Sequence, residues 1–147
     1  MNKLFLYLAS LSFILLSCES DNDITYATPD YISGKWVFSK IGTINPQPVY
    51  SVIYQDYQND ASCDKDNLTL NPDTTFSSND FAAQGLSCVN TSINGSYTLV
   101  NKDITLSYTQ DNVPTIETYT ITALTYTELT IVGNQNGTTT FYKLVRE

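Results

Sequence analysis

From Ser33 to the end of the chain, the apolar residues never adopt the 3.6-residue spacing of an amphipathic helix. They alternate instead with polar residues, as in the run Ile-Thr-Leu-Ser-Tyr-Thr at positions 104–109. Alternation of this kind puts the apolar side chains on one face of a half-buried strand. The same region is rich in Thr, Tyr, Ile, Val and Asn, which favour strands and turns over helices. The sequence therefore predicts an all-β domain.

Short segments with strand character follow one another along this region. The predicted strands are Gly34–Thr43, Val49–Gln55, Asn67–Leu70, Thr74–Ser78, Ser96–Val100, Ile104–Thr109, Thr115–Ala123, Glu128–Val132 and Thr138–Val145. Short consecutive strands joined by hairpin turns predict a small antiparallel up-and-down β-barrel of about eight strands, with a β-sandwich as the alternative.

Turn residues separate several of these strands. Asn71-Pro72-Asp73 and Asn101-Lys102-Asp103 suit tight turns, and Asn136-Gly137 suits a hairpin that needs positive φ. Asn94-Gly95 predicts a further turn. The segments at 56–66 and 81–91 carry no strand pattern, and we expect them to be irregular loops.

The beginning of the chain differs from the rest. A positive start at Met1-Asn2-Lys3 precedes an apolar run from Leu4 to Leu16, and small residues close the run at Ser17-Cys18. This order of charge, apolar run and small residues is typical of a secretory signal. The run is shorter than the roughly 20 residues that a membrane-spanning helix needs.

The tetrapeptide Leu15-Leu16-Ser17-Cys18 resembles the lipobox of bacterial lipoproteins. In that class a type II signal peptidase cuts before the cysteine, which then carries lipid. The resemblance implies a signal peptide at 1–17, a lipid anchor on Cys18 and a membrane partner through that lipid. The alternative is an ordinary secretory signal with a chance cysteine.

Residues 18–29 are acidic and poor in apolar side chains, which predicts a tether before a domain at 30–147. Acids directly after a lipidated cysteine resemble the signals that send some Gram-negative lipoproteins to the outer face of the outer membrane. A plain solvated spacer is the alternative. We expect an outer membrane lipoprotein of the bacterial cell envelope, either periplasmic or surface-exposed.

The charge balance argues against several partners. The chain has 7 Lys and Arg against 15 Asp and Glu, a formal net charge of −8. Binding to nucleic acid needs cations that replace phosphate counterions, and binding to anionic headgroups needs a basic surface. We therefore expect no nucleic-acid partner.

Two cysteines remain after Cys18, at Cys63 and Cys88. In an exported chain, such a pair predicts one disulfide. Closing a loop of this length stabilises a fold by about 3 kcal/mol through chain entropy. The alternatives are a reactive thiol or a zinc site, which would need carboxylate ligands because the chain has no histidine.

The sequence lacks most of the residue arrangements that catalysis commonly uses. Without histidine, neither a Ser-His-Asp nor a Cys-His arrangement can form. No glycine-rich phosphate loop appears, and most acids fall in the tether and the predicted loops. We expect no enzyme, no metal site and no cofactor; a hydrolase that uses a carboxylate pair is the least favoured alternative.

Several short motifs, in order, resemble a known family. Gly34-Lys35-Trp36 matches the Gly-x-Trp motif that opens the first strand of lipocalins and related calycin barrels. The later motifs are Cys63-Asp64-Lys65-Asp66-Asn67-Leu68-Thr69-Leu70, Asp73-Thr74-Thr75-Phe76, Cys88, Gly95-Ser96-Tyr97-Thr98-Leu99 and Phe141-Tyr142-Lys143-Leu144-Val145-Arg146. From Ile32 to Arg146 the chain resembles the lipocalin-like domains of small bacterial lipoproteins.

The resemblance implies roles for residues at the barrel floor. Gly34 would open the first strand, Trp36 would plug the floor, and a basic residue near the chain end would lie over the tryptophan. Arg146 is the first candidate for that residue and Lys143 the second. The other lipocalin motifs and the helix that follows the barrel in lipocalins are not found in this sequence.

Two functions remain open. The barrel is either a binding module for a small apolar or glycan-like ligand, or a packed structural module that contacts an envelope protein through the segments 46–60 and 81–91. Tyr50, Tyr54 and Tyr57 are candidate contacts for a ligand or partner, although strands also favour aromatic residues without any binding role. A packed centre is expected if the bulky residues Phe38, Phe76, Leu106, Tyr119 and Phe141 meet inside the barrel.

Overall fold

The computed structural model describes residues 27–45, 50–135 and 137–147. The predictions about the signal peptide and about lipid on Cys18 lie outside these residues. Within them, the chain forms one short helix and nine strands: α1 (Pro29–Ile32), β1 (Gly34–Asn45), β2 (Ser51–Asp56), β3 (Asn67–Leu70), β4 (Thr75–Gln84), β5 (Ser87–Val100), β6 (Asp103–Gln110), β7 (Val113–Leu124), β8 (Glu128–Gln135) and β9 (Thr138–Arg146). None of the described residues belongs to a helix with the length and apolarity needed to cross a membrane.

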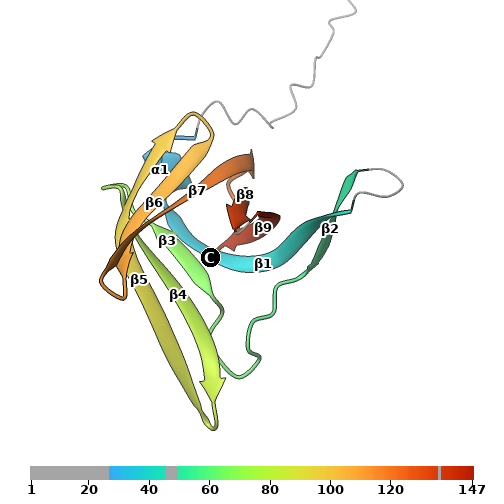
Figure 1. Ribbon diagram of the computed structural model, residues 1–147, viewed down its shortest axis with the longest axis vertical. Coiled ribbons are helices and arrows are strands. Elements are labelled where there is room, and N and C mark those ends of the chain that lie inside the picture. The colour runs from blue at the N-terminus through green and yellow to red at the C-terminus, as the bar shows by residue number, and fades with distance from the viewer. Residues whose placement is uncertain (1–26, 46–49, 136) are drawn as a thin grey trace, which may run out of the picture.

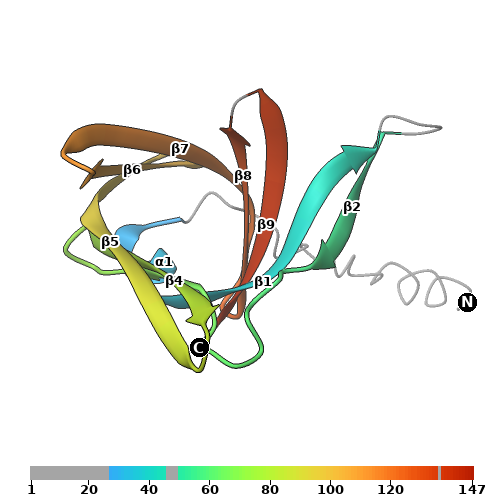
Figure 2. The ribbon, with the colours of Figure 1, turned by 60° about the horizontal axis from the view of Figure 1, so that its bottom comes forward.

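The strands form one antiparallel sheet that closes on itself. Their order is β2-β1-β3-β4-β5-β6-β7-β8-β9, and β1 pairs with β9 as well (Figures 1 and 2). All strands except β2 therefore make a closed barrel of eight strands. The predicted up-and-down antiparallel barrel is confirmed, and the sandwich alternative is wrong.

Strand β1 has two different neighbours along one of its edges. Residues Gly34–Val37 pair with β3, whereas Lys40–Asn45 pair with β2. The β1–β2 hairpin consequently extends away from the barrel wall, as Figure 1 shows. We call the end with the turns at 71–74, 101–102 and 125–127 the base, and the opposite end, with the turns at 85–86 and 111–112, the mouth.

The base contains the buried core of the barrel. The largest fully buried side chains gather around it: Trp36, Tyr97, Ile32, Leu70, Ile104, Ile121, Leu129 and Leu144. Helix α1 closes this end, because the indole Nε1 of Trp36 donates to the Ile32 carbonyl at 2.7 Å. A buried indole N–H needs such an acceptor, so this hydrogen bond also fixes the orientation of the ring.

Arg146 joins the end of the barrel to its beginning. Its guanidinium carbon lies 4.3 Å from the centre of the Trp36 ring, and its nitrogens donate to the carbonyls of Ser33 at 2.5 Å and Tyr31 at 2.8 Å. Gly34 has a φ of +141°, and a Cβ at this position would lie 2.9 Å from the Arg146 Nη1. A glycine is therefore required both for the backbone conformation and for the close approach of the guanidinium.

The segment 81–91, predicted as an irregular loop, is instead the paired outer part of the β4–β5 hairpin. The ladder runs from Asp80↔Thr91 to Gln84↔Ser87, with Gly85 at the turn. Its Asn, Ser, Gln and Ala residues have low strand propensity, but pairing with the adjacent strand overrides that preference. Figure 1 shows this hairpin extending well beyond the barrel wall.

The predicted turn at Asn94-Gly95 is also wrong, because both residues lie inside β5. Gly95 faces Phe76 on β4 and Tyr108 on β6, and a Cβ there would lie 2.2 Å from the Ser107 carbonyl oxygen. The glycine therefore permits a close approach of neighbouring strands rather than a turn.

The predicted disulfide between Cys63 and Cys88 is confirmed. It joins the loop 57–66 to the outer part of β5, and thus links one loop to a hairpin rather than two loops to each other. In the same loop, Asp60 accepts a hydrogen bond from the Ala83 amide at 3.0 Å and Asp66 accepts one from the Phe81 amide at 2.7 Å. The loop thereby satisfies the outer edge of β4, where β3 no longer reaches.

The packing of the base predicts a large effect for Trp36→Ala. Removal of a fully buried tryptophan should lower the free energy of unfolding by about 3–5 kcal/mol, measured by urea denaturation. The matched control is Tyr126→Ala, because Tyr126 is 73% exposed although its ring centre lies only 5.2 Å from the same guanidinium. We expect the control to change stability by less than about 1 kcal/mol; equal effects for the two variants would contradict the floor role of Trp36.

Candidate functional site

The mouth half of the barrel contains a cavity of about 260 Å³. Each of the eight barrel strands contributes at least one side chain to its wall, and the loop 57–66 adds one more. The lining residues are Phe38, Tyr57, Leu68, Phe76, Ser78, Ile93, Leu106, Tyr108, Gln110, Glu117, Tyr119, Ile131 and Tyr142. The cavity is therefore the interior of the barrel itself, above the packed base.

Most of the bulky residues that would fill a packed barrel do point inward. Phe38, Phe76, Leu106 and Tyr119 all line the cavity, but they form its wall and leave space between them. The prediction that Phe141 points inward is wrong, since its neighbour Tyr142 lines the cavity instead. Side chains alternate along a strand, so a shift of one residue moves the whole apolar set to the other face.

Aromatic rings form much of the wall. Phe38 stacks on Tyr57 with ring centres 5.0 Å apart. It also contacts Tyr142 edge to face, with ring centres 5.7 Å apart. Tyr119 and Tyr142 also meet edge to face, with ring centres 6.4 Å apart. Such offset and edge arrangements are the favourable ones for aromatic pairs, and they fix the ring positions around the cavity.

One acidic side chain lies within this aromatic wall. The carboxylate of Glu117 accepts a hydrogen bond from the Tyr108 hydroxyl at 2.9 Å and one from the Tyr119 hydroxyl at 2.8 Å. Glu117 belongs to β7 and lies opposite Leu106 of β6. Of the described residues that line the cavity, Glu117 alone carries a charged group.

The environment keeps the neighbouring phenols neutral. Burial raises the pKa of Tyr108 to about 12, with further contributions from its hydrogen bond to Glu117 and from the negative charge of that residue. Burial also raises the pKa of Tyr142, and the charge of Glu117 adds to the effect. Both causes disfavour a phenolate, so these hydroxyls remain hydrogen-bond donors at neutral pH.

The structure does not bring the three predicted contact tyrosines together. Tyr57 lines the cavity, and burial raises its pKa, followed by the charge of the nearby Asp66. Tyr54 is half-buried on the β1–β2 hairpin, where the Lys143 ammonium lies 4.9 Å from its ring centre. Tyr50 is 80% exposed beside the mouth end of that hairpin. Only Tyr57 therefore belongs to the candidate site.

The floor residues Gly34, Trp36 and Arg146 lie together at the base, away from the cavity lining. Lys143, the second candidate for the contact with Trp36, instead contacts Tyr54 and forms an ion pair with Glu128 at 3.5 Å. Within the part of the chain that the structure describes, no three His, Cys, Asp or Glu residues are placed to hold a metal ion.

Glu117 was not identified from the sequence, because most acids fall in the tether and the predicted loops and Glu117 was not considered separately. The signal that could have identified it is the alternation in β7, where Glu117 shares its face with Tyr119 and with the fully buried Ile121. Ile116, its apolar neighbour, is 71% exposed. The two-residue period of the strand therefore places the acid on the inner, apolar face and the isoleucine on the outer, polar face.

The Tyr108–Glu117 hydrogen bond predicts a change in titration for Glu117→Gln. Without the carboxylate charge, the pKa of Tyr108 should fall below about 12 but stay above its ordinary value, because burial is the larger cause. NMR of the tyrosine ring carbons would measure the change, with Tyr108→Phe to assign the signal. An unchanged titration would contradict the contact.

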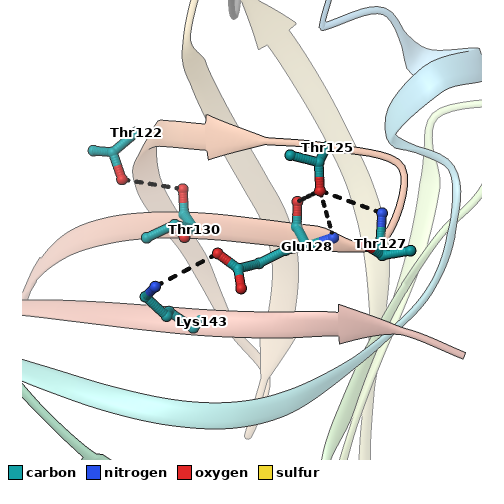
Figure 3. Close-up of polar contacts among 6 residues, drawn as sticks. All are labelled: Thr122, Thr125, Thr127, Glu128, Thr130 and Lys143. Atoms are coloured by element: carbon teal, nitrogen blue, oxygen red, sulfur yellow. Dashed lines mark hydrogen bonds and ion pairs between the residues drawn. The ribbon is translucent and has the colours of Figure 1, made fainter. Parts of the chain in front are cut away.

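The control for this experiment is Glu128→Gln. Glu128 points toward Lys143 on the neighbouring strand, as Figure 3 shows, and lies outside the cavity lining. Its substitution removes the same charge but should leave Tyr108 unaffected. In the unmodified protein and in Glu128→Gln, the raised pKa of Tyr108 stabilises the fold below about pH 10, and this contribution is lost as the pH rises toward about 12.

The protein family that matches the chain agrees with this architecture. The family description "lipocalin-like domain" matches residues 32–131. No curated protein sequence matches the chain significantly. Among solved structures, an uncharacterized protein from Bacteroides eggerthii is similar with a TM-score of 0.53 and 14% identity, covering 78% of this chain and 98% of that chain. A deswapped triple mutant of bovine odorant-binding protein has a TM-score of 0.42 and 17% identity, covering 78% and 73% of the two chains.

Proposed function

Because this chain belongs to the lipocalin-like domain family, we propose that its barrel is a binding module that takes up one small ligand with an apolar part through the mouth. The lipocalin fold is typically a binding fold, which favours uptake over catalysis. The observation that carries the proposal is the cavity of about 260 Å³, to which every strand of the barrel contributes. A barrel of eight strands is wide enough either to fill with side chains or to hold one small ligand.

The chemistry of the wall suits a ligand that has both apolar and polar parts. Leu68, Ile93, Leu106 and Ile131 supply aliphatic surface between the aromatic rings, whereas Ser78, Gln110, Glu117 and the tyrosines supply polar groups. A concave site that combines apolar surface with placed polar groups is the usual form of a small-molecule site. The volume lies slightly below the range of about 300–1,000 Å³ for drug-sized ligands, so we expect a compact molecule.

A second candidate function is docking to an envelope protein. Three apolar side chains are strongly exposed near the mouth, with exposures of 80% for Tyr50, 108% for Leu86 and 60% for Val113. They lie on three different hairpins. Exposed apolar groups can mark a site for protein interaction, although single exposed residues are also common on protein surfaces.

Native mass spectrometry of the full chain, purified from a bacterial envelope, tests the first function. The expected result is a discrete added mass that is lost on denaturation. Ile93→Trp places a larger side chain in the cavity, so that a bound ligand would overpack it at a cost of about 1–3 kcal/mol, and should weaken binding by about tenfold. Ile116→Trp makes the same change at a position 71% exposed on the barrel exterior and should leave the bound fraction unchanged. Equal occupancy in both variants would contradict binding inside the barrel.

We also propose that the chain is a lipoprotein of the bacterial envelope, anchored through Cys18. The support is the order of positive start, apolar run and lipobox-like tetrapeptide at residues 1–18. Several acyl chains hold a protein at a membrane firmly, since each buried CH₂ contributes about 0.8 kcal/mol.

Metabolic labelling with an alkyne fatty acid tests the anchor. Cys18→Ser should abolish the label and release the protein from the membrane fraction. The double variant Cys63→Ser, Cys88→Ser removes the other two thiols and should keep both the label and the membrane association. Continued labelling of Cys18→Ser would contradict the proposal.

A further inference from the structure

The charge of Glu117 has no cationic partner in the cavity wall. No lysine or arginine is among the described residues that line it. Among the described residues, ion pairs join Lys35 to Glu147, Lys40 to Asp56 and Lys143 to Glu128, and Arg146 is held at the base. A carboxylate accepts about four hydrogen bonds, and the two phenols occupy two of these positions. The carboxylate of Glu117 therefore retains acceptor capacity.

A ligand that enters the cavity changes the hydration of this carboxylate. Any molecule that fills the space displaces water from around Glu117. An apolar ligand leaves that loss of hydration uncompensated, which costs free energy. A ligand with a positive group compensates it, because a charge-assisted hydrogen bond or ion pair replaces the lost water.

The same network disfavours an anionic ligand. A tyrosine has one O–H to donate, and those of Tyr108 and Tyr119 are both directed to Glu117. The phenols nearest the carboxylate therefore cannot donate to a ligand carboxylate or phosphate at the same time. The charge of Glu117 would repel such a ligand as well.

The aromatic wall also favours a cationic ligand. Besides these two phenols, the rings of Phe38, Tyr57, Phe76 and Tyr142 line the cavity. Aromatic rings attract cations through their quadrupoles, and the attraction is stronger where water is excluded. A carboxylate within such a group of rings is a suitable environment for an organic ammonium ion.

From these observations we propose that the ligand of the barrel is a small organic cation, an amine or quaternary ammonium on an apolar body, with Glu117 as its counter-charge. This inference rests on the proposed binding function. It specifies the chemical class of the ligand that the same cavity takes. Glu117 determines the charge preference, and the aliphatic and aromatic wall holds the apolar part.

A charge series on one molecular framework tests the inference. The probes are phenethylamine, phenethyl alcohol and hydrocinnamate, titrated by calorimetry into the full chain in lipid nanodiscs, with protein-free nanodiscs as the reference. We expect phenethylamine to bind at least about tenfold more tightly than the alcohol, the scale of one charge-assisted hydrogen bond. Hydrocinnamate should bind most weakly.

The variants locate the preference. Glu117→Gln should bring the affinity ratio of amine to alcohol close to one, because it removes the charge that favours the amine. Glu128→Gln, which removes a charge outside the cavity lining, should preserve the ratio of the unmodified protein. A thermal melt of each variant shows whether it is folded. If Glu117→Gln is not, the charge series on the unmodified protein decides alone.

The outcomes separate this inference from the function on which it rests. Equal affinities for amine and alcohol, or tighter binding of hydrocinnamate, would overturn the cation preference while small-ligand binding stands. A preference for the amine that persists in folded Glu117→Gln would overturn the role of Glu117. No binding by any probe, together with no added mass in the native protein, would overturn both proposals.

Discussion

The contact of Arg146 with Trp36 and helix α1 is the interaction on which the rest of the structure depends. It fastens the last strand to the beginning of the first, where β1 and β9 close the barrel. A sheet that closes in this way has no free edge along its wall at the base. Because the guanidinium also covers the indole, the same side chain closes the sheet and seals the floor. Gly34 favours this contact, because its φ is positive and a Cβ there would lie 2.9 Å from the Arg146 Nη1.

Stability and binding capacity occupy different halves of the barrel. The fully buried side chains gather around the base, whereas the rings of the mouth half stand around open space. A barrel with one solid half can leave the other half hollow, because burial at the base supplies much of the apolar contribution to folding. At the mouth, the disulfide and the carboxylates of the loop 57–66 support the outer part of β4. The wall of the cavity is therefore stabilised there by contacts with the loop 57–66 outside the barrel, and the interior is not filled.

Much of the fold could be predicted from the sequence, because the barrel interior imposes a two-residue period on β6 and its neighbours. The floor residues Gly34, Trp36 and Arg146 are recognisable from short motifs, and the disulfide follows from the cysteine count. The outer β4–β5 hairpin could not be predicted, since its pairing depends on the neighbouring strand rather than on its own polar residues. The inward placement of Tyr142 instead of Phe141 depends on strand register, which sequence alone left open. Glu117 could have been found by following the alternation of β7 and accepting an acid on the inner face.

The position of Ala27 and Thr28 has a consequence for how the barrel is presented. Ala27 packs against the buried cluster, and the Thr28 side chain caps α1 at the base. A chain anchored at Cys18 would thus be attached at its base, through the eight intervening residues 19–26, and the extended span from Cys18 to Ala27 is at most about 30 Å. The attachment point would then lie at the sealed floor, at the end of the barrel opposite the opening. A ligand dissolved in the aqueous phase could therefore reach the opening without passing the anchor.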